Sequence, residues 1–181
     1  PPVGAALVAN YPEIETSTRI FKPGDAVVTR TVGDQLKSFT ETRVFGVDSN
    51  FLQVFDYALE QGNPATCLSN TNSIVLTAGM ARKYFGNEPA MGKTLSLFND
   101  HVPFTVTGVL RDIPEASTLQ FDFLTPMSYY GTVRYFTWSW VWCALMTYVK
   151  VSPQVAGHPD RIAELEAKFP EMVRVQAAPA F

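Results

Sequence analysis

One short pattern, Leu-x-Ala-x-aromatic-Pro-Glu-apolar, occurs near both ends of the chain, at residues 7–14 and again at 165–172. In each copy the residues before the proline have helical spacing. The residues after it suit a strand, because proline seldom continues a helix. Two matched helix-to-strand units indicate a pseudo-repeat. We therefore predict that both chain ends build one lobe and that the middle of the chain forms a second, inserted lobe.

The sequence around each copy predicts the extent of its helix. Pro2 suits the first turn of a helix over 2–11. Asp160 can cap a later helix over 161–169, and a proline is expected to end this helix before a short strand at 172–175. The residues expected to face inward from the later helix are Ile162, Leu165 and Phe169.

Turn residues between β-rich segments predict two hairpins. The first joins 16–21 to 26–32 through a Pro-Gly turn, and the second joins 94–98 to 103–110. A further strand is expected over about 37–47. These segments make strands the main component of the middle of the chain.

The clearest local unit is a strand that leads directly into a helix. Residues 73–76 form an apolar, β-branched run, and Thr77 can cap a helix over 78–85. Gly86 suits the position just after that helix. The strand, the Thr77 cap, the helix and the glycine after it are mutually consistent, so we predict them as one unit.

Three tryptophans stand at alternate positions in the segment 138–149. Trp138, Trp140 and Trp142 alternate with smaller residues, which predicts a strand with its bulky face in the core. The alternative is that these rings stack on a ligand or a partner.

Composition excludes several classes of protein. The 181 residues carry a formal net charge of −3 and contain no charge block, which argues against binding of nucleic acid. The longest uncharged, aromatic-rich stretch, 135–149, is shorter than the roughly 20 apolar residues of a membrane span. No signal peptide is recognisable at the start of the sequence.

Candidate chemical motifs are weak. The segment Gly92-Lys93-Thr94 lacks the spacing and the following helix of a phosphate-binding loop. His101 and His158 belong to no metal-ligand pattern and are expected in loops. We expect the histidines and the lysine to have no catalytic or binding role.

The cysteines and the carboxylate pairs suggest no reaction either. Cys67 and Cys143 fit neither a disulfide framework nor a zinc site, and we predict that they are not bonded to each other. The acidic runs at 13–15 and 164–166 are expected to be solvated. We accordingly assign no catalytic, cofactor-binding or metal-binding residue and expect no cofactor.

An ordered set of short motifs spans most of residues 11–150 and resembles one known family. The motifs lie at 44–51, 55–59, 62–64, 72–77, 80–86, 92–94, 104–114 and 121–122. Together they resemble the MacB-like periplasmic core domain of FtsX-type ABC transporter permeases, in the version common in Bacteroidetes-type permeases.

The resemblance implies an α+β fold with a porter-like β-α-β lobe split between both chain ends and an inserted mixed α/β lobe. Residues 1–44 and 138–181 would form the first lobe, and 45–137 the second. The family's first strand should precede the first helix, so one edge of the first lobe is expected to be missing. The family offers no catalytic residues to carry over.

The same resemblance implies a function. The chain would be the periplasm-facing, non-catalytic domain of an inner-membrane ABC permease that couples cytoplasmic ATP hydrolysis to export, lipoprotein release or activation of a partner. Its partners would be its own transmembrane helices, a cytoplasmic ABC ATPase, a second permease and a periplasmic adaptor or substrate protein. The alternative is a periplasmic module that binds a solute or peptide. A hydrolase is the weakest hypothesis.

Overall fold

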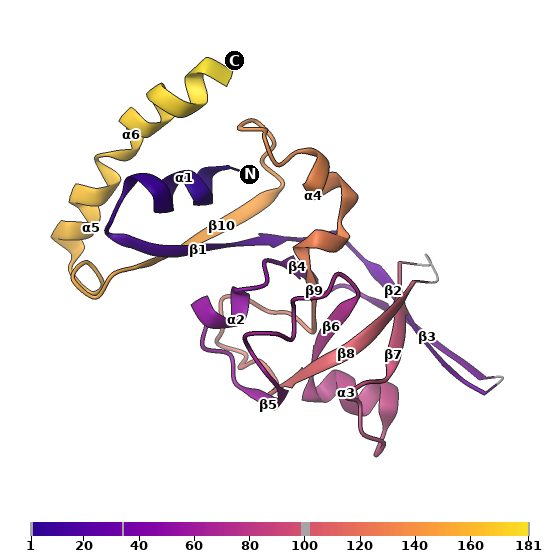
Figure 1. Cartoon of the computed structure of the whole chain (residues 1–181). Helices are drawn as coiled ribbons and strands as arrows, with labels where there is room; N and C mark the ends of the chain where they lie inside the picture. Colours follow the sequence, from indigo (N-terminus) through magenta and orange to yellow (C-terminus); the bar gives the residue numbers. More distant parts are fainter. Residues whose placement is uncertain (1, 34, 99–101, 181) are drawn as a thin grey trace. The chain divides into compact units, whose positions relative to one another are not determined.

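Contacts divide the chain into two compact units, which are described separately below. Unit 1 comprises Pro1–Arg19 and Thr132–Phe181, and unit 2 comprises Ile20–Gly131. The structure, a computed structural model, describes residues 2–33, 35–98 and 102–180 (Figure 1). Within these residues no helix has the length and apolar character needed to cross a membrane.

Unit 1 combines several helices with two strands. Strand β1 lies next to β10 in the sheet order, and the last residues of β1 continue into unit 2. The elements are α1 (Val3–Asn10), β1 (Ile14–Phe21), α4 (Gly131–Tyr135), β10 (Leu145–Val151), α5 (Pro159–Glu166) and α6 (Phe169–Met172), followed by a π-helical turn (Val173–Ala177) and a 3-10 turn (Ala178–Ala180).

Both copies of the end pattern contribute to one apolar core in unit 1. The equivalent positions Leu7 and Leu165 are both buried in it. Tyr11 contacts its equivalent, Phe169, with ring centroids 5.5 Å apart. The Tyr11 hydroxyl donates a hydrogen bond to the carbonyl of Lys168 at 3.1 Å. The repeated pattern therefore marks equivalent buried positions.

The strand predicted at 172–175 is wrong, because this segment is helical. Pro170 lies in the first turn of α6, a position where the missing N–H is tolerated, so it does not end the helical path. The predicted inward position of Ile162 is also wrong, since 37% of this residue is exposed. Only Leu165 of α5 is buried.

Unit 2 is built on a mixed sheet. The strand order is β4-β9-β6-β8-β7-β2-β3, with the end of β1 beside β4 and β5 paired to β8. Two pairs are parallel, β4 with β9 and β6 with β8. The elements are β2 (Ala26–Val32), β3 (Gln35–Glu41), β4 (Val44–Val47), α2 (Phe51–Val54), β5 (Leu59–Gly62), β6 (Ser73–Thr77), α3 (Ala78–Phe85), β7 (Thr94–Leu97), β8 (Pro103–Leu110), β9 (Phe123–Pro126) and a 3-10 turn (Met127–Tyr129).

The predicted hairpin between 16–21 and 26–32 is wrong in its pairing. Both strands exist, but β1 lies between β10 and β4, whereas β2 pairs with β3 and β7. Val32 pairs with Gln35, and Gly33, which follows Val32, has φ 56°, a conformation that glycine adopts without strain. The single strand predicted over 37–47 is divided into β3 and β4, which have different neighbours.

Two further predictions for the middle of the chain, the strand-to-helix unit and the second hairpin, are confirmed. Strand β6 leads into α3, the Thr77 hydroxyl accepts a hydrogen bond from the Met80 N–H, and Gly86 follows the helix with φ 62°. Strands β7 and β8 pair as an antiparallel hairpin. Its expected turn, 99–101, lies outside the described residues.

Two aromatic and aliphatic clusters pack in unit 2. Tyr84 and Phe85 of α3 pack on apolar residues of the sheet, including Val44. Phe45 follows Val44 in β4 and so points to the opposite side, where its ring lies 5.7 Å from that of Phe121. Phe51 of α2 also contacts Phe121. Helix α3 and the α2 region thus cover different faces of β4.

The predicted tryptophan-bearing strand is wrong over its first half, because β10 begins only at Leu145. Trp138 is 67% exposed, whereas Ser139, expected on the outer face, is buried. The Ser139 hydroxyl accepts a hydrogen bond from the Trp142 N–H at 3.1 Å. Local turns therefore replace the period-two arrangement.

The assignment of 1–44 with 138–181 and of 45–137 as domains stays a prediction. The boundaries between the two compact units lie after Arg19 and after Gly131.

We predict that Leu7→Asp lowers the free energy of unfolding of unit 1 by at least about 3 kcal/mol, because it buries an unpaired charge in the shared core. Leu165→Asp should act on the same transition. All three tryptophans lie in unit 1, so urea denaturation followed by tryptophan fluorescence measures the effect. The control is Val8→Asp, at a 37% exposed neighbour, which should cost less than about 1 kcal/mol. Equal losses for Leu7→Asp and Val8→Asp would contradict the shared core.

Candidate functional site

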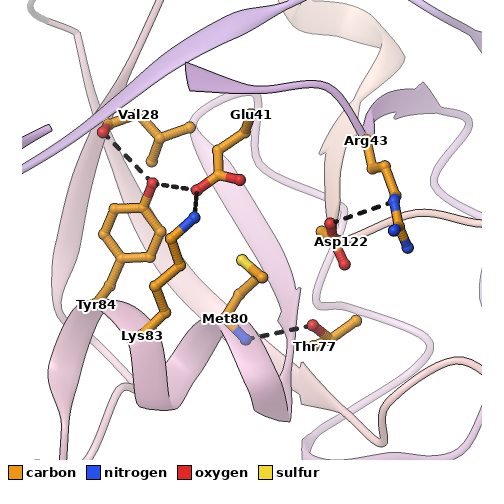
Figure 2. Close-up of polar contacts among 8 residues, drawn as sticks. All are labelled: Val28, Glu41, Arg43, Thr77, Met80, Lys83, Tyr84 and Asp122. Atoms are coloured by element: carbon orange, nitrogen blue, oxygen red, sulfur yellow. Dashed lines mark hydrogen bonds and ion pairs between the residues drawn. The ribbon is translucent and has the colours of Figure 1, made fainter. Parts of the chain in front are cut away.

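A cluster of polar side chains lies between the β2–β3 hairpin and α3 in unit 2 (Figure 2). We call Glu41, Lys83 and Tyr84 the Glu41 cluster. Glu41 is the last residue of β3, and only 6% of it is exposed. Lys83 and Tyr84 are neighbours in the last turn of α3. A charged side chain this deeply buried needs partners, and the cluster supplies them.

Both partners bind the same carboxylate oxygen. The Tyr84 hydroxyl donates to Glu41 Oε1 at 2.6 Å, and Lys83 Nζ donates to it at 2.6 Å (Figure 2). The Tyr84 hydroxyl also lies 3.5 Å from the Val28 carbonyl oxygen of β2. These contacts join the end of α3 to both strands of the hairpin.

Burial and the neighbouring charge keep the Tyr84 phenol protonated. Burial raises the pKa of the Tyr84 phenol, and the hydrogen bond to Glu41 and its negative charge raise this pKa further. The phenol therefore stays a hydrogen-bond donor at neutral pH. Lys83 Nζ lies 4.5 Å from the centroid of the Phe39 ring, and this contact stabilises its charge. The Tyr84 hydroxyl cannot readily release its proton, so it is poorly suited to acid–base chemistry. The cluster is instead suited to holding α3 and the hairpin together.

Arg30 of β2 makes a second attachment to the end of α3. Its guanidinium donates to the Tyr84 carbonyl oxygen at 2.7 Å and to Glu88 at 2.9 Å, and it lies 4.5 Å from the centroid of the Phe85 ring. Lys93 pairs with the same Glu88 carboxylate. Hydrogen bonds from Lys93 and then Arg30 lower the pKa of Glu88. Strand β2 is thus tied to the helix by packing as well as by charge.

Asp122 and Arg43 form a looser pair beside the cluster. Arg43 Nε lies 3.8 Å from Asp122 Oδ2 (Figure 2). Burial raises the pKa of Asp122, and Arg43 only partly opposes this effect. The backbone carbonyl of Asp122 accepts a hydrogen bond from the Thr77 N–H at the start of α3. Both ends of α3 are therefore bound to neighbouring segments.

The candidate chemical residues weighed from the sequence lie outside the Glu41 cluster, and Lys93 pairs with Glu88 beside Arg30. Lys93 follows a turn at Gly92 and leads into β7, which confirms that the segment precedes a strand. His158 is exposed before α5, and His101 lies outside the described residues. Within the described ranges, no group of three or more His, Cys, Asp or Glu side chains could hold a metal ion.

The cysteines and acidic runs have ordinary surroundings. Cys67 is buried, which raises the pKa of its thiol, and Cys143 is exposed; both are free thiols. Glu13 pairs with Lys168 and Glu15 with Lys150.

Sequence reasoning missed the Glu41 cluster. Glu41 fell inside a strand predicted over 37–47, and Tyr84 was assigned only to the apolar face of a helix. Alternation places Phe39 and Glu41 on one face of β3, which was the available signal. That signal does not tell which face α3 covers.

A family model described as MacB-like periplasmic core domain matches residues 2–164. No curated protein matches the chain.

Three solved structures are similar to this chain. A domain assigned to a permease protein from Porphyromonas gingivalis has a TM-score of 0.77 and 22% identity, over 96% of this chain and 69% of that one. The periplasmic region of MacB from Actinobacillus actinomycetemcomitans has a TM-score of 0.65 and 23% identity, over 97% and 73%. The extracellular domain of the ABC-type transporter YknZ from Gram-positive bacteria has a TM-score of 0.54 and 15% identity, over 89% and 76%. These similarities confirm the predicted α+β fold class.

We predict that Tyr84→Phe lowers the free energy of unfolding by about 1.5–3 kcal/mol, because the buried Glu41 carboxylate loses a charge-assisted hydrogen bond. Chemical denaturation of the purified chain measures this loss. The control is Arg82→Gln, which breaks the exposed pair with Asp112 and should cost less than about 1 kcal/mol. A loss for Tyr84→Phe no larger than that of the control would contradict a structural role for the cluster.

We also predict a pH-dependent effect of Asp122→Asn. The raised pKa means that the folded state binds this proton at higher pH than the unfolded state, so the stability contributed by Asp122 falls as the pH rises through the folded pKa. Asp122→Asn should therefore be more stable than wild type at neutral pH, and the gain should shrink as the pH falls toward about 4.

The matched control is Asp112→Asn. The Gly79 N–H is the main cause that lowers the pKa of Asp112, so this variant should lose stability at neutral pH and recover relative to wild type in acid. Thermal denaturation at a series of pH values measures both variants. The same sign of effect for the two would contradict the burial of Asp122.

Proposed function

The chain belongs to the family of MacB-like periplasmic core domains, and from this premise we propose that it is the non-catalytic coupling module of an ABC transporter permease. Membership of this family makes it a periplasmic domain of a MacB/FtsX-like permease. In the proposed role, ATP hydrolysis in the cytoplasm moves the membrane helices, and the periplasmic units move with them. This movement would serve export, lipoprotein release or activation of a partner.

The observation that carries this proposal is the division into two units, each with its own core. Unit 1 has the core shared by the chain ends, and unit 2 has the core under α3. The Glu41 cluster and Arg30 bind the β2–β3 hairpin to α3, so that unit 2 can transmit a displacement without deforming internally. A mechanical element needs this internal stiffness, because a soft one would absorb the movement.

The expected partners follow from the same proposal. They are the protein's own transmembrane helices, a cytoplasmic ABC ATPase, a second permease and a periplasmic adaptor or substrate protein. The expected location is the inner membrane, with this domain facing the periplasm.

The alternative, a module that binds a solute or peptide, is supported by one cavity in unit 2. This cavity has a volume of about 500 Å³, and Tyr57, Ile113 and Pro114 are among its lining residues. Bound ligand would stabilise the folded state, so a thermal-shift screen of small molecules and peptides tests this alternative. Stabilisation that disappears in Tyr57→Ala would favour it.

We predict that nucleotide changes the distance between the two units in the full-length permease with its ATPase. Spin labels at Leu36→Cys in unit 2 and Glu166→Cys in unit 1 report this distance, in a Cys143→Ser background that removes the exposed native thiol. The control pair, Leu36→Cys with Gln61→Cys, lies wholly in unit 2 and should not change. Pulsed electron paramagnetic resonance measures both distances with and without a trapped nucleotide.

Unchanged distances in both pairs would contradict the coupling proposal. A change that requires an added solute and ignores nucleotide would instead favour the binding module.

A further inference from the structure

The segment that links α4 to β10 presents large side chains to solvent. We call residues 135–143 the aromatic loop; Figure 1 draws it in orange between these two elements of unit 1. Tyr135, Trp138 and Val141 are 70%, 67% and 63% exposed. Three large apolar or aromatic side chains this exposed are thus concentrated in one short segment, whereas scattered single residues would need no explanation.

Local contacts hold the loop in this shape. The Thr137 hydroxyl donates to the Arg134 carbonyl at 3.2 Å, and the Ser139 N–H donates to the Phe136 carbonyl at 3.0 Å. The Phe136 and Trp142 rings stack with centroids 5.2 Å apart. The exposed rings are thus presented by a folded turn with its own hydrogen bonds.

The chemistry of the loop fits a lipid surface. No charged residue occurs between Arg134 and Lys150. Tyrosine and tryptophan combine an apolar ring with a polar group, and they favour the region of lipid headgroups. We propose that the aromatic loop inserts into the headgroup region of a phospholipid bilayer.

A protein partner fits these residues less well. Protein interfaces surround an apolar centre with polar groups that fix the orientation of the partner. The hydroxyls of Thr137 and Ser139 are already used in bonds to the loop's own backbone. A bilayer requires no directional contact, so the remaining apolar surface is sufficient for it.

The loop leads into a strand that packs on the first helix of unit 1. Strand β10 begins at Leu145, and its Thr147 lies close to Gly4 in the first turn of α1, where an added Cβ would lie 3.1 Å from Thr147 Cγ2. The loop is thus continuous with the framework of unit 1. The presence of a membrane near this domain rests on the proposed function, but the chemistry of the loop does not.

The test is binding of the 181-residue chain to vesicles. All three tryptophans lie in the loop, so quenching of their fluorescence by brominated phosphatidylcholine directly reports insertion. We expect quenching by vesicles of phosphatidylcholine alone, little changed by salt or by added phosphatidylglycerol. Trp138→Ser should weaken the partitioning by about tenfold, since it removes one large ring from the contact. For this variant and its control, an environment-sensitive dye on the exposed Cys143 provides the readout.

The matched control is Leu36→Ser, which removes an apolar side chain that is 68% exposed but lies in unit 2. It should bind vesicles as the wild type does. Absence of vesicle binding by the wild type, equal binding by Trp138→Ser, or binding only to phosphatidylglycerol and only at low salt would each overturn the proposal. Self-association or partner capture that depends on Trp138 without vesicle binding would also overturn it. The chain could bind vesicles while the distance between the two units stays unchanged by nucleotide. This pair of results would support lipid binding by the aromatic loop and would reject the coupling role.

Discussion

The hydrogen bonds of the Glu41 carboxylate hold together the parts of unit 2 that the sequence order leaves separate. Strand β3 is exposed along most of its length. Lys83 and Tyr84 of α3 hold its last residue, Glu41, in place. A buried ion pair is weak evidence for stability, because desolvation offsets much of the attraction. In this structure Lys83 and Tyr84 satisfy the carboxylate, so moving the hairpin away from α3 would leave a buried charge unpaired. Packing by Phe39 against Tyr84 adds the apolar part of that contact.

Unit 1 reaches its stability by a different route. Its core comes from residues near the two chain ends, with Tyr11 against Phe169 as a central contact. Closing such a long loop costs conformational entropy, but this cost rises only slowly with length. This core couples two segments that lie far apart in sequence, residues 7–14 and 155–172, which suits the proposed coupling role.

The two proposals depend on different parts of the same chain. Coupling depends on internal ties, among them Arg30 to α3, whereas lipid contact depends on the exposed rings of the aromatic loop. Burying that loop at a bilayer would fix the orientation of unit 1 relative to the membrane. A fixed unit 1 would give unit 2 a reference against which to move. Neither role requires a titrating nucleophile or a bound metal.

Features that neighbouring residues specify could be predicted without the structure. The run from β6 through the Thr77 cap to Gly86 could be predicted, because capping and periodicity act within a few residues. The end pattern identified Leu7 and Leu165 as buried, and the ordered motifs identified the family.

Strand pairing and the burial of polar groups, by contrast, depend on contacts between distant segments of the folded chain. Strand β2 pairs with β3 and β7 and not with β1, and Pro170 continues a helical path where the same pattern at Pro12 leads to a strand. Glu41 became a central residue because Lys83 and Tyr84 reach it from a helix more than 40 residues away in sequence. Such choices depend on the free energy of contacts between distant segments, which no local pattern contains.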